Sequence, residues 1–120
     1  MAKLLIAVKS EIISAALAEA LPQHQVHSCH TGTAALALLE SLRPDIFIVE
    51  LSLPVVSGLA VLRHTRCKPP VILALTNLIN HDVLQAAADA GVQDMLLLPC
   101  PIACILRHLD GLIEIPTPQA

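Results

Sequence analysis

Aromatic residues are almost missing from this 120-residue chain, which has one phenylalanine and neither tryptophan nor tyrosine. Charged side chains are also scarce, at 14% of the residues, and the formal net charge is −3. Proteins that bind nucleic acid normally present a cationic face, often with aromatic rings on which bases stack. We therefore expect no direct binding of DNA or RNA.

Long apolar runs are missing too, although 55% of the residues are hydrophobic. A membrane-spanning helix needs about 20 apolar residues in a row, and the core of a secretory signal needs about 7–15. The N-terminal apolar run at residues 4–8 is shorter than either. We expect a cytoplasmic protein without a membrane segment. The length suits one domain, placed at residues 1–115, and Pro116-Thr117-Pro118 indicates that residues 116–120 are a tail or the start of a linker.

The four cysteines, Cys29, Cys67, Cys100 and Cys104, include no Cys-x-x-Cys pair. In a cytosolic protein such residues are typically free thiols, mostly buried. His27 and Cys29 share one face of a predicted strand, but two ligands are a weak indication of a metal site. We therefore expect no metal and no cofactor.

The chain does contain a regular alternation of two patterns. Short apolar runs rich in β-branched residues indicate buried strands, and apolar residues three and four apart indicate amphipathic helices. The predicted strands are residues 4–8, 25–29, 46–49, 71–75 and 93–98, and the predicted helices are residues 11–21, 31–42, 58–66, 82–90 and 102–113. Five strand–helix units predict an α/β fold, with a parallel sheet and helices on both of its faces.

One carboxylate directly follows a predicted buried strand. Glu50 comes after Ile46 to Val49, and the segment Leu53-Pro54 to Gly58 then leads into a helix. The carboxyl edge of an open parallel sheet is where ligands bind and chemistry takes place. Glu50 is therefore the first candidate for a functional side chain.

The whole chain resembles the receiver domain of bacterial two-component response regulators. The resemblance rests on the following segments, in this order: Lys3-Leu4-Leu5-Ile6-Ala7-Val8; Gly32 with Ala34-Ala35-Leu36; Pro44-Asp45 and Glu50, followed by Leu53-Pro54 and Gly58; Val71-Ile72-Leu73-Ala74-Leu75-Thr76; and Ala90-Gly91-Val92-Gln93-Asp94, continuing to Leu98-Pro99. It implies a flavodoxin-like (βα)5 fold, doubly wound, with strand order 2-1-3-4-5. It also implies a role in signal transduction.

In receiver domains, two acids after the first strand help to hold Mg²⁺, and an aspartate after the third strand accepts a phosphoryl group. A hydroxyl after the fourth strand and a lysine after the fifth contact the phosphoryl oxygens. The resemblance assigns these positions, in the same order, to Val8 and Lys9, Glu50, Thr76 and Leu98. Only Thr76 keeps the expected type of side chain. The aromatic switch position of the family falls on Met95.

These departures predict that the chemistry of the family is lost. Mg²⁺ needs oxygen ligands in octahedral geometry, whereas Val8 offers none and Lys9 brings a cation. Glu50 is also one methylene longer than aspartate, and an error of about 1 Å can slow phosphoryl transfer on the order of 10²-fold. We expect a degenerate receiver with a direct Lys9–Glu50 ion pair. Alternatively, Glu50 mimics the phosphorylated state by directing its charge toward Thr76.

A degenerate receiver would act through protein contacts and would not be an enzyme. In the family, the face made by the fourth helix, the fifth strand and the fifth helix often forms dimers. Here those elements are residues 82–90, 93–98 and 102–113, and they carry few charges. We expect a protein partner or a homodimer on this face. Two alternatives stay open: an atypical phospho-accepting receiver, and a thiol redox sensor that uses Cys100 and Cys104.

Overall fold

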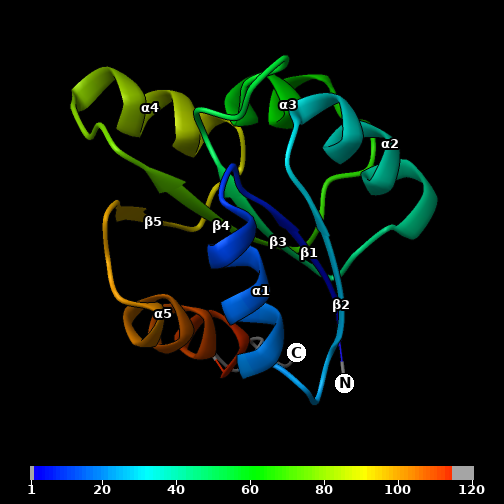
Figure 1. Cartoon of the computed structure of the whole chain (residues 1–120). Coiled ribbons are helices and arrows are strands. Elements are labelled where there is room, and N and C mark those ends of the chain that lie inside the picture. The colour runs from blue at the N-terminus through cyan, green and yellow to red at the C-terminus, as the bar shows by residue number, and fades with distance from the viewer. Residues whose placement is uncertain (1, 115–120) are drawn as a thin grey trace, which may run out of the picture.

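The computed structural model describes residues 2–114, so the predicted tail at 116–120 lies outside the described residues. Within that range, strands and helices alternate along the chain (Figure 1). The strands are β1 (Lys3–Ala7), β2 (Gln25–Cys29), β3 (Ile46–Glu50), β4 (Val71–Thr76) and β5 (Asp94–Leu97). The helices are α1 (Glu11–Ala20), α2 (Gly32–Leu42), α3 (Gly58–His64), α4 (His81–Asp89) and α5 (Ile102–Glu114).

All five strands pair in parallel in one sheet, in the order β2-β1-β3-β4-β5. This arrangement confirms the predicted flavodoxin-like fold class. β1 and β3 lie side by side at the centre, with Ala7 opposite Val49. Because the strands run in the same direction, their carboxyl ends meet along one edge of the sheet.

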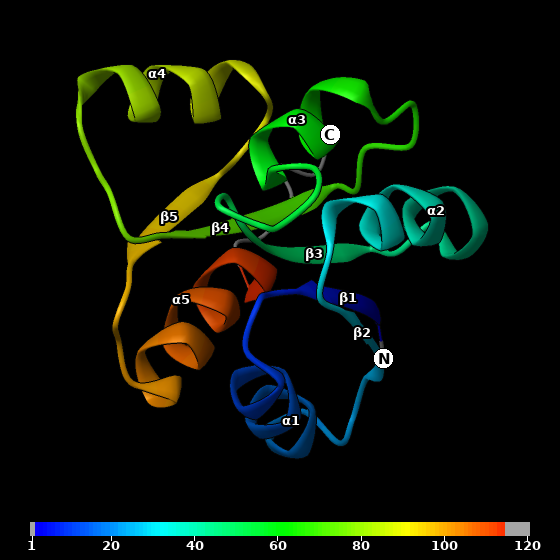
Figure 2. The ribbon, with the colours of Figure 1, turned by 45° about the horizontal axis from the view of Figure 1, so that its top comes forward.

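The helices form a layer on each face of the sheet, as Figure 2 shows with the sheet seen nearly edge-on. α1 and α5 cover one face, and their Leu17, Ile105 and Leu109 pack against the same side of the strands. α2, α3 and α4 cover the other face, where Phe47, the single aromatic residue, is completely buried. Both faces of the sheet are thus covered, which explains the continuous apolar runs in the strands.

Side-chain caps set the beginnings of four helices. Ser10, Thr31, Ser57 and Asn80 each accept a hydrogen bond from the backbone N–H three residues later. Such caps satisfy amides that have no partner within the helix. The Asn80 cap starts α4 at His81, one residue before the predicted start. None of the described helices has the length and apolar character that crossing a bilayer requires.

Four predicted elements were too long, α1 and α2 by one residue and α3 and β5 by two. The third helix was predicted to reach Arg66 but ends at His64, where Thr65 turns to an extended conformation. The fifth strand was predicted at 93–98 but spans Asp94–Leu97. The Gln93 side chain bridges to β4 instead: its Oε1 accepts from the Ile72 N–H, and its Nε2 donates to the Pro70 carbonyl. The Gln93 side chain thus continues the hydrogen bonding to the β4 side of the sheet just before β5 begins.

Candidate functional site

The carboxyl edge of the sheet gathers five of the six residues singled out in the sequence. Val8 and Lys9 follow β1, Glu50 ends β3, Thr76 ends β4, and Leu98 follows β5. Met95, the sixth, lies inside β5 and is half-buried against the core below α4. Parallel pairing of β1, β3 and β4 is what brings the first four together.

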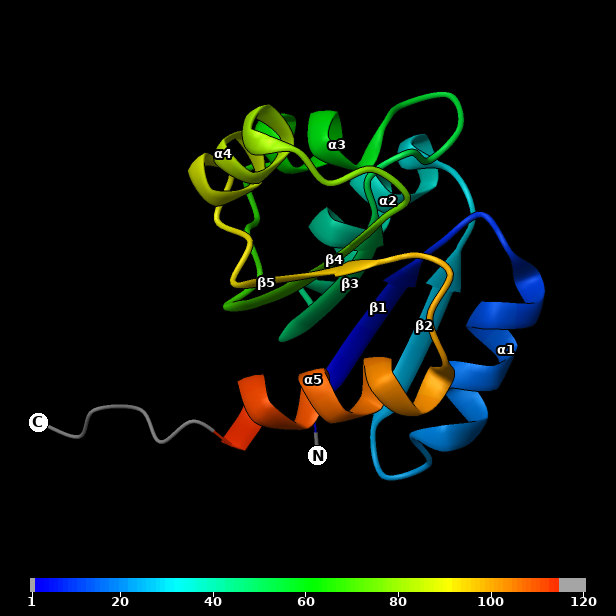
Figure 3. The ribbon, with the colours of Figure 1, turned by 90° about the vertical axis from the view of Figure 1, so that its left-hand side faces the viewer.

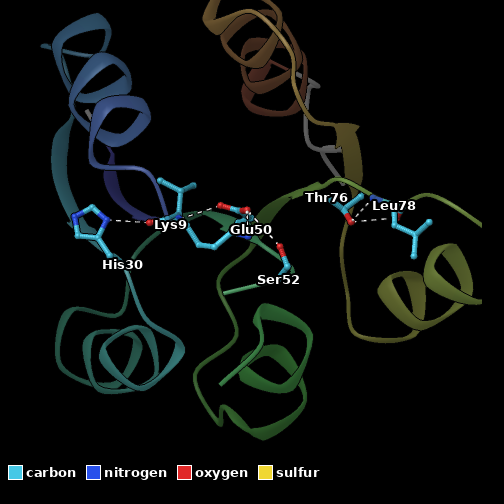
Figure 4. A network of polar contacts seen from close by, with 7 residues as sticks. Lys9, His30, Glu50, Ser52, Thr76 and Leu78 are labelled. Carbon is cyan, nitrogen blue, oxygen red and sulfur yellow. Dashed lines mark hydrogen bonds and ion pairs between the residues drawn. The ribbon is translucent and has the colours of Figure 1, made fainter. Parts of the chain in front are cut away.

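Glu50 is the most buried charged residue of this edge, with a relative exposure of 6%. The backbone N–H of Lys9 donates to Oε1 at 2.9 Å, and the Lys9 ammonium lies 3.5 Å from Oε2. The Ser52 hydroxyl donates to Oε2 at 3.3 Å. Figure 4 shows these contacts converging on the carboxylate. The predicted Lys9–Glu50 ion pair is confirmed, and both carboxylate oxygens have partners.

The two residues after β1 make this edge of the sheet unfavourable for binding a cation. Val8 is buried and apolar, and its carbonyl accepts a hydrogen bond from Nδ1 of His30 at 2.9 Å. Nδ1 of His30 therefore carries the proton in this contact. Lys9 places its ammonium beside the only carboxylate of the Glu50 network. The positive charge next to Glu50 thus comes from the protein itself.

Thr76 does not take part in the Glu50 network. Its hydroxyl donates to the Leu78 carbonyl at 3.1 Å and accepts from the Leu78 N–H at 3.2 Å. In Figure 4, Thr76 and Leu78 lie to one side of the Glu50 carboxylate. The partners of Glu50 are Lys9 and Ser52, so the geometry does not provide the approach to Thr76 that a phosphorylated-state mimic was expected to use.

A cavity of about 300 Å³ opens beside Glu50. Its walls are Ile13 of α1, Glu50, Asn77, and Leu98-Pro99-Cys100 after β5. Leu98 gives this cavity an apolar wall and brings no cation to it. Glu50 is the single charged residue among these wall residues, so the cavity has few groups that would bind phosphoryl oxygens.

Gly58 allows α3 to begin very close to the strand that carries Glu50. A Cβ at Gly58 would lie 2.3 Å from the Glu50 carbonyl oxygen and 2.9 Å from the Leu51 Cα. The Gly58 N–H donates to the Leu51 carbonyl at 2.9 Å. The loop between β3 and α3 therefore fixes the backbone beneath the site.

Sequence reasoning missed two members of this site, Ser52 and His30. Both are polar residues within two positions of a strand end, which is a weak signal on its own. His27 and Cys29 do not form a metal site with a third ligand, since no group of three metal-ligating side chains occurs within residues 2–114. His27 instead contacts Gln25 at 3.2 Å, and Cys29 is buried.

The thiols near the site are not activated. Burial raises the pKa of Cys100, and the neighbouring Cys104 raises it further. Burial also raises the pKa of Cys29, to about 11. Since the thiolate is the reactive form, these shifts do not favour the redox-sensor alternative.

Comparison with known proteins agrees with this architecture. Response regulator MprA of Mycobacterium avium is 28% identical over 100 residues, which are 80% of this chain and 43% of that protein. The chain thus spans less than half the length of such relatives. Chemotaxis protein CheY4 of Vibrio cholerae superimposes with a TM-score of 0.83 at 25% identity, covering 93% of this chain and 98% of that one. The non-phosphorylated HemR receiver domain of Leptospira biflexa gives 0.86 at 20% identity, with full coverage of both chains.

The family assignment rests on the sequence match together with the fold. Residues 5–110 match the family model of the response regulator receiver domain. This range includes β2 to β5 in full and all of β1 except its first two residues. The chain therefore belongs to the response regulator receiver domain family, the signalling modules of two-component systems.

Proposed function

We propose that this chain is a degenerate receiver domain, a pseudo-receiver that signals through protein contacts and does not use Mg²⁺-dependent phosphorylation. The observation that carries the proposal is the Lys9–Glu50 ion pair, with 3.5 Å between Nζ and Oε2. In this reading, Val8 and Lys9 occupy the former acidic-pair positions, and Glu50 occupies the phospho-acceptor position. Thr76 is the retained hydroxyl, Leu98 replaces the lysine, and Met95 replaces the aromatic switch residue.

The Lys9 ammonium takes the role that a divalent ion would have beside the acceptor carboxylate. Mg²⁺ is usually held by one or two carboxylates together with substrate phosphate and waters. Asp45, the other acid of the β3 segment, lies at the opposite end of the strand and accepts from the Lys3 N–H at 2.9 Å. An incoming Mg²⁺ would therefore meet one carboxylate, already bound to Lys9, and would be repelled by the ammonium.

Phosphoryl transfer would also lack its second cation. Catalysis of this reaction depends on positioned charge around the transferred group. Leu98 lines the cavity beside Glu50 and offers no charge. The Thr76 hydroxyl is held by the backbone of Leu78. We accordingly propose no enzymatic activity and no cofactor for this domain.

Incubation with acetyl phosphate and Mg²⁺, followed by intact-mass measurement, tests the proposal. We expect no added phosphate on the native chain. A quadruple variant, Val8→Asp, Lys9→Asp, Glu50→Asp and Leu98→Lys, restores the family pattern and should gain a phosphate under the same conditions. A phosphorylated native chain would instead establish the atypical phospho-accepting receiver.

The α4–β5–α5 face is the surface that we propose for a homodimer or another protein partner. Figure 3 looks onto this side of the molecule, with α4, β5 and α5 one below the other. Leu84 of α4 and Leu97 of β5 are about half exposed there, at 47% and 52%. Asp94 and His108 form a contact of 2.6 Å between β5 and α5 on the same side. A surface that exposes apolar side chains and carries few charges is typical of a protein–protein interface.

Light scattering at micromolar concentration tests self-association through this face. We expect a dimer that Leu97→Asp converts to a monomer. Ile12→Asp is the matched control, because Ile12 is 82% exposed but lies on α1, away from the face. If the native chain is monomeric at micromolar concentration, the homodimer is excluded and the proposed partner on this face is a different protein. A dimer that Ile12→Asp dissociates would place the interface elsewhere.

We also propose that the domain occupies residues 1–115 and that the protein acts in the cytoplasm without contacting nucleic acid directly. The described residues, 2–114, include all five strand–helix units, which supports the domain boundary. A fragment of residues 1–115 should unfold cooperatively with the same circular dichroism spectrum as the 120-residue chain. Loss of that transition would show that residues 116–120 belong to the domain.

A further inference from the structure

The cavity beside Glu50 is not accounted for by the loss of phosphoryl chemistry. It has a volume of about 300 Å³ and is bordered by the start of α1, the end of β3, the residue after β4 and the segment after β5. Its walls are Ile13, Glu50, Asn77, Leu98, Pro99 and Cys100. Pockets for small ligands usually measure about 300–1,000 Å³. The cavity is therefore large enough for one bulky side chain and small for a nucleotide.

The Glu50 carboxylate retains capacity to accept a further hydrogen bond. An ionised carboxylate offers about four lone-pair sites. Within residues 2–114, Oε1 accepts from the Lys9 N–H, whereas Oε2 accepts from the Ser52 hydroxyl and lies beside the Lys9 ammonium. Neither Lys9 nor Ser52 is among the described walls of the cavity, so both reach the carboxylate from other directions. One lone pair of Oε1 therefore remains for a donor that enters the cavity.

The charges around this acceptor favour a neutral donor. The Lys9 ammonium, 3.5 Å from Oε2, already balances the negative charge of Glu50 and would repel a second cation. An anion in the cavity would meet the carboxylate, which is the single charge among the wall residues. Ile13, Leu98 and Pro99 make most of the remaining wall apolar. The cavity thus suits an apolar group that carries one neutral hydrogen-bond donor.

A tryptophan side chain combines these properties. Its ring is large and apolar, and its indole N–H is a donor only and needs an acceptor when it is buried. Tryptophan is also frequent among the residues that fill pockets at the centre of protein interfaces. This chain has neither tryptophan nor tyrosine, and its single phenylalanine, Phe47, is completely buried, so a second copy does not supply such a group. We propose that a tryptophan of a different protein inserts into the cavity and donates its indole N–H to the Glu50 carboxylate.

Two exposed apolar side chains border the cavity and extend the surface that a partner would cover. Ile12 is 82% exposed and precedes the wall residue Ile13, and Leu78 is 57% exposed and follows the wall residue Asn77. Contacts around a buried anchor exclude water from it. This surface lies at the carboxyl edge of the sheet and is centred away from the α4–β5–α5 face. The inference rests on the proposed function in one respect, which is that the domain acts through protein contacts.

Titration of the isotope-labelled 120-residue chain with N-acetyltryptophanamide, followed by proton–nitrogen correlation NMR, tests the site. We expect the backbone amide signals of Glu50, Asn77 and Leu98 to shift with a dissociation constant on the order of 1 mM, because a single anchor provides little binding free energy. The indole-N-methylated analogue keeps the ring but lacks the donor. It should bind at least about tenfold more weakly, because the hydrogen bond to the carboxylate is lost.

Two variants locate the binding. Leu98→Phe fills the cavity and should abolish the shifts. Ala88→Leu is the matched control, because Ala88 lines a different cavity, of about 270 Å³, between α4 and β5. Ala88→Leu should leave binding beside Glu50 unchanged. The NMR spectrum of each variant shows whether it is folded, and the methylated analogue gives a result on the native chain even if Leu98→Phe does not fold.

Three results would overturn the proposal. The first is the absence of shifts around Glu50 at about 10 mM probe, tenfold above the expected constant. The second is equal affinity for the methylated analogue. The third is unchanged binding to a folded Leu98→Phe variant, or shifts centred on Ala88. The titration contains no phosphodonor and does not depend on self-association, so its failure is distinguishable from failure of the phosphorylation and light-scattering tests.

Discussion

Replacing Lys9 by methionine tests how much the Lys9–Glu50 ion pair stabilises the fold. The Lys9 side chain is 47% exposed and the Glu50 side chain 8% exposed, so one end of the pair is solvated and the other is not. Exposed ion pairs contribute about 0.2–1 kcal/mol, and the burial of Glu50 places this one in the upper half of that range, at about 0.5–1 kcal/mol. Methionine retains most of the aliphatic stem, so the loss of packing is small.

The carboxylate should matter more than the ammonium. Glu50 accepts from the Lys9 N–H at 2.9 Å and from the Ser52 hydroxyl at 3.3 Å, and Lys9→Met leaves both bonds in place. Glu50→Gln keeps the shape but removes the charge, and hydrogen bonds to charged groups contribute about 1 kcal/mol more than neutral ones. We expect Glu50→Gln to cost about 1–2 kcal/mol and Glu50→Ala, which leaves the partly buried Lys9 N–H without its carboxylate acceptor, about 2–3 kcal/mol.

Urea unfolding followed by far-UV circular dichroism measures these differences, since the chain has neither tryptophan nor tyrosine for fluorescence. A double-mutant cycle of Lys9→Met with Glu50→Gln gives the coupling energy directly. Lys68→Met is the control, because its ammonium donates to the Ala90 carbonyl at 2.8 Å and not to a carboxylate. A Lys9–Glu50 coupling below about 0.3 kcal/mol, no larger than that of Lys68 with Glu50, would refute the reasoning.

Two further predictions concern the packing near the site. Gly58→Ala should destabilise the fold by about 2 kcal/mol or more, because its Cβ would lie 2.3 Å from the Glu50 carbonyl oxygen and 2.9 Å from the Leu51 Cα. Gly111→Ala is its matched control in α5, where no atom lies within 4 Å, and should stabilise by about 0.5–1 kcal/mol; similar urea midpoints for the two variants would contradict this account. Burial raises the pKa of Cys29 from 9.0 to about 11. The stability that the fold gains from keeping this thiol protonated is therefore fully present below pH 9 and is lost as the pH rises toward 11. The loss is at most roughly 2–3 kcal/mol, and Cys29→Ala should show a flatter decline of stability over that range; equal slopes would argue against a buried thiol.

The sequence predicted most of the fold because apolar runs and helical spacing repeat without interruption. It also predicted the Lys9–Glu50 pair, for a topological reason: both residues follow central strands, and parallel strands end at one edge of the sheet. The errors lie at element ends. There, side-chain bonds decide where regular structure begins: the Asn80 cap is local, whereas the Gln93 bridge depends on Ile72, which lies far away along the chain.

The sequence alone therefore determined the α/β class, the strand order implied by the family resemblance, and the kinds of side chain at the carboxyl edge. Only the tertiary structure decided how those side chains are used. It gave Glu50 a second partner in Ser52, turned the Thr76 hydroxyl to Leu78, and left Cys100 beside the cavity. The physical reason is that strand formation follows local pattern, whereas loop paths and hydrogen-bond partners at a sheet edge are set by the packing of segments distant in sequence.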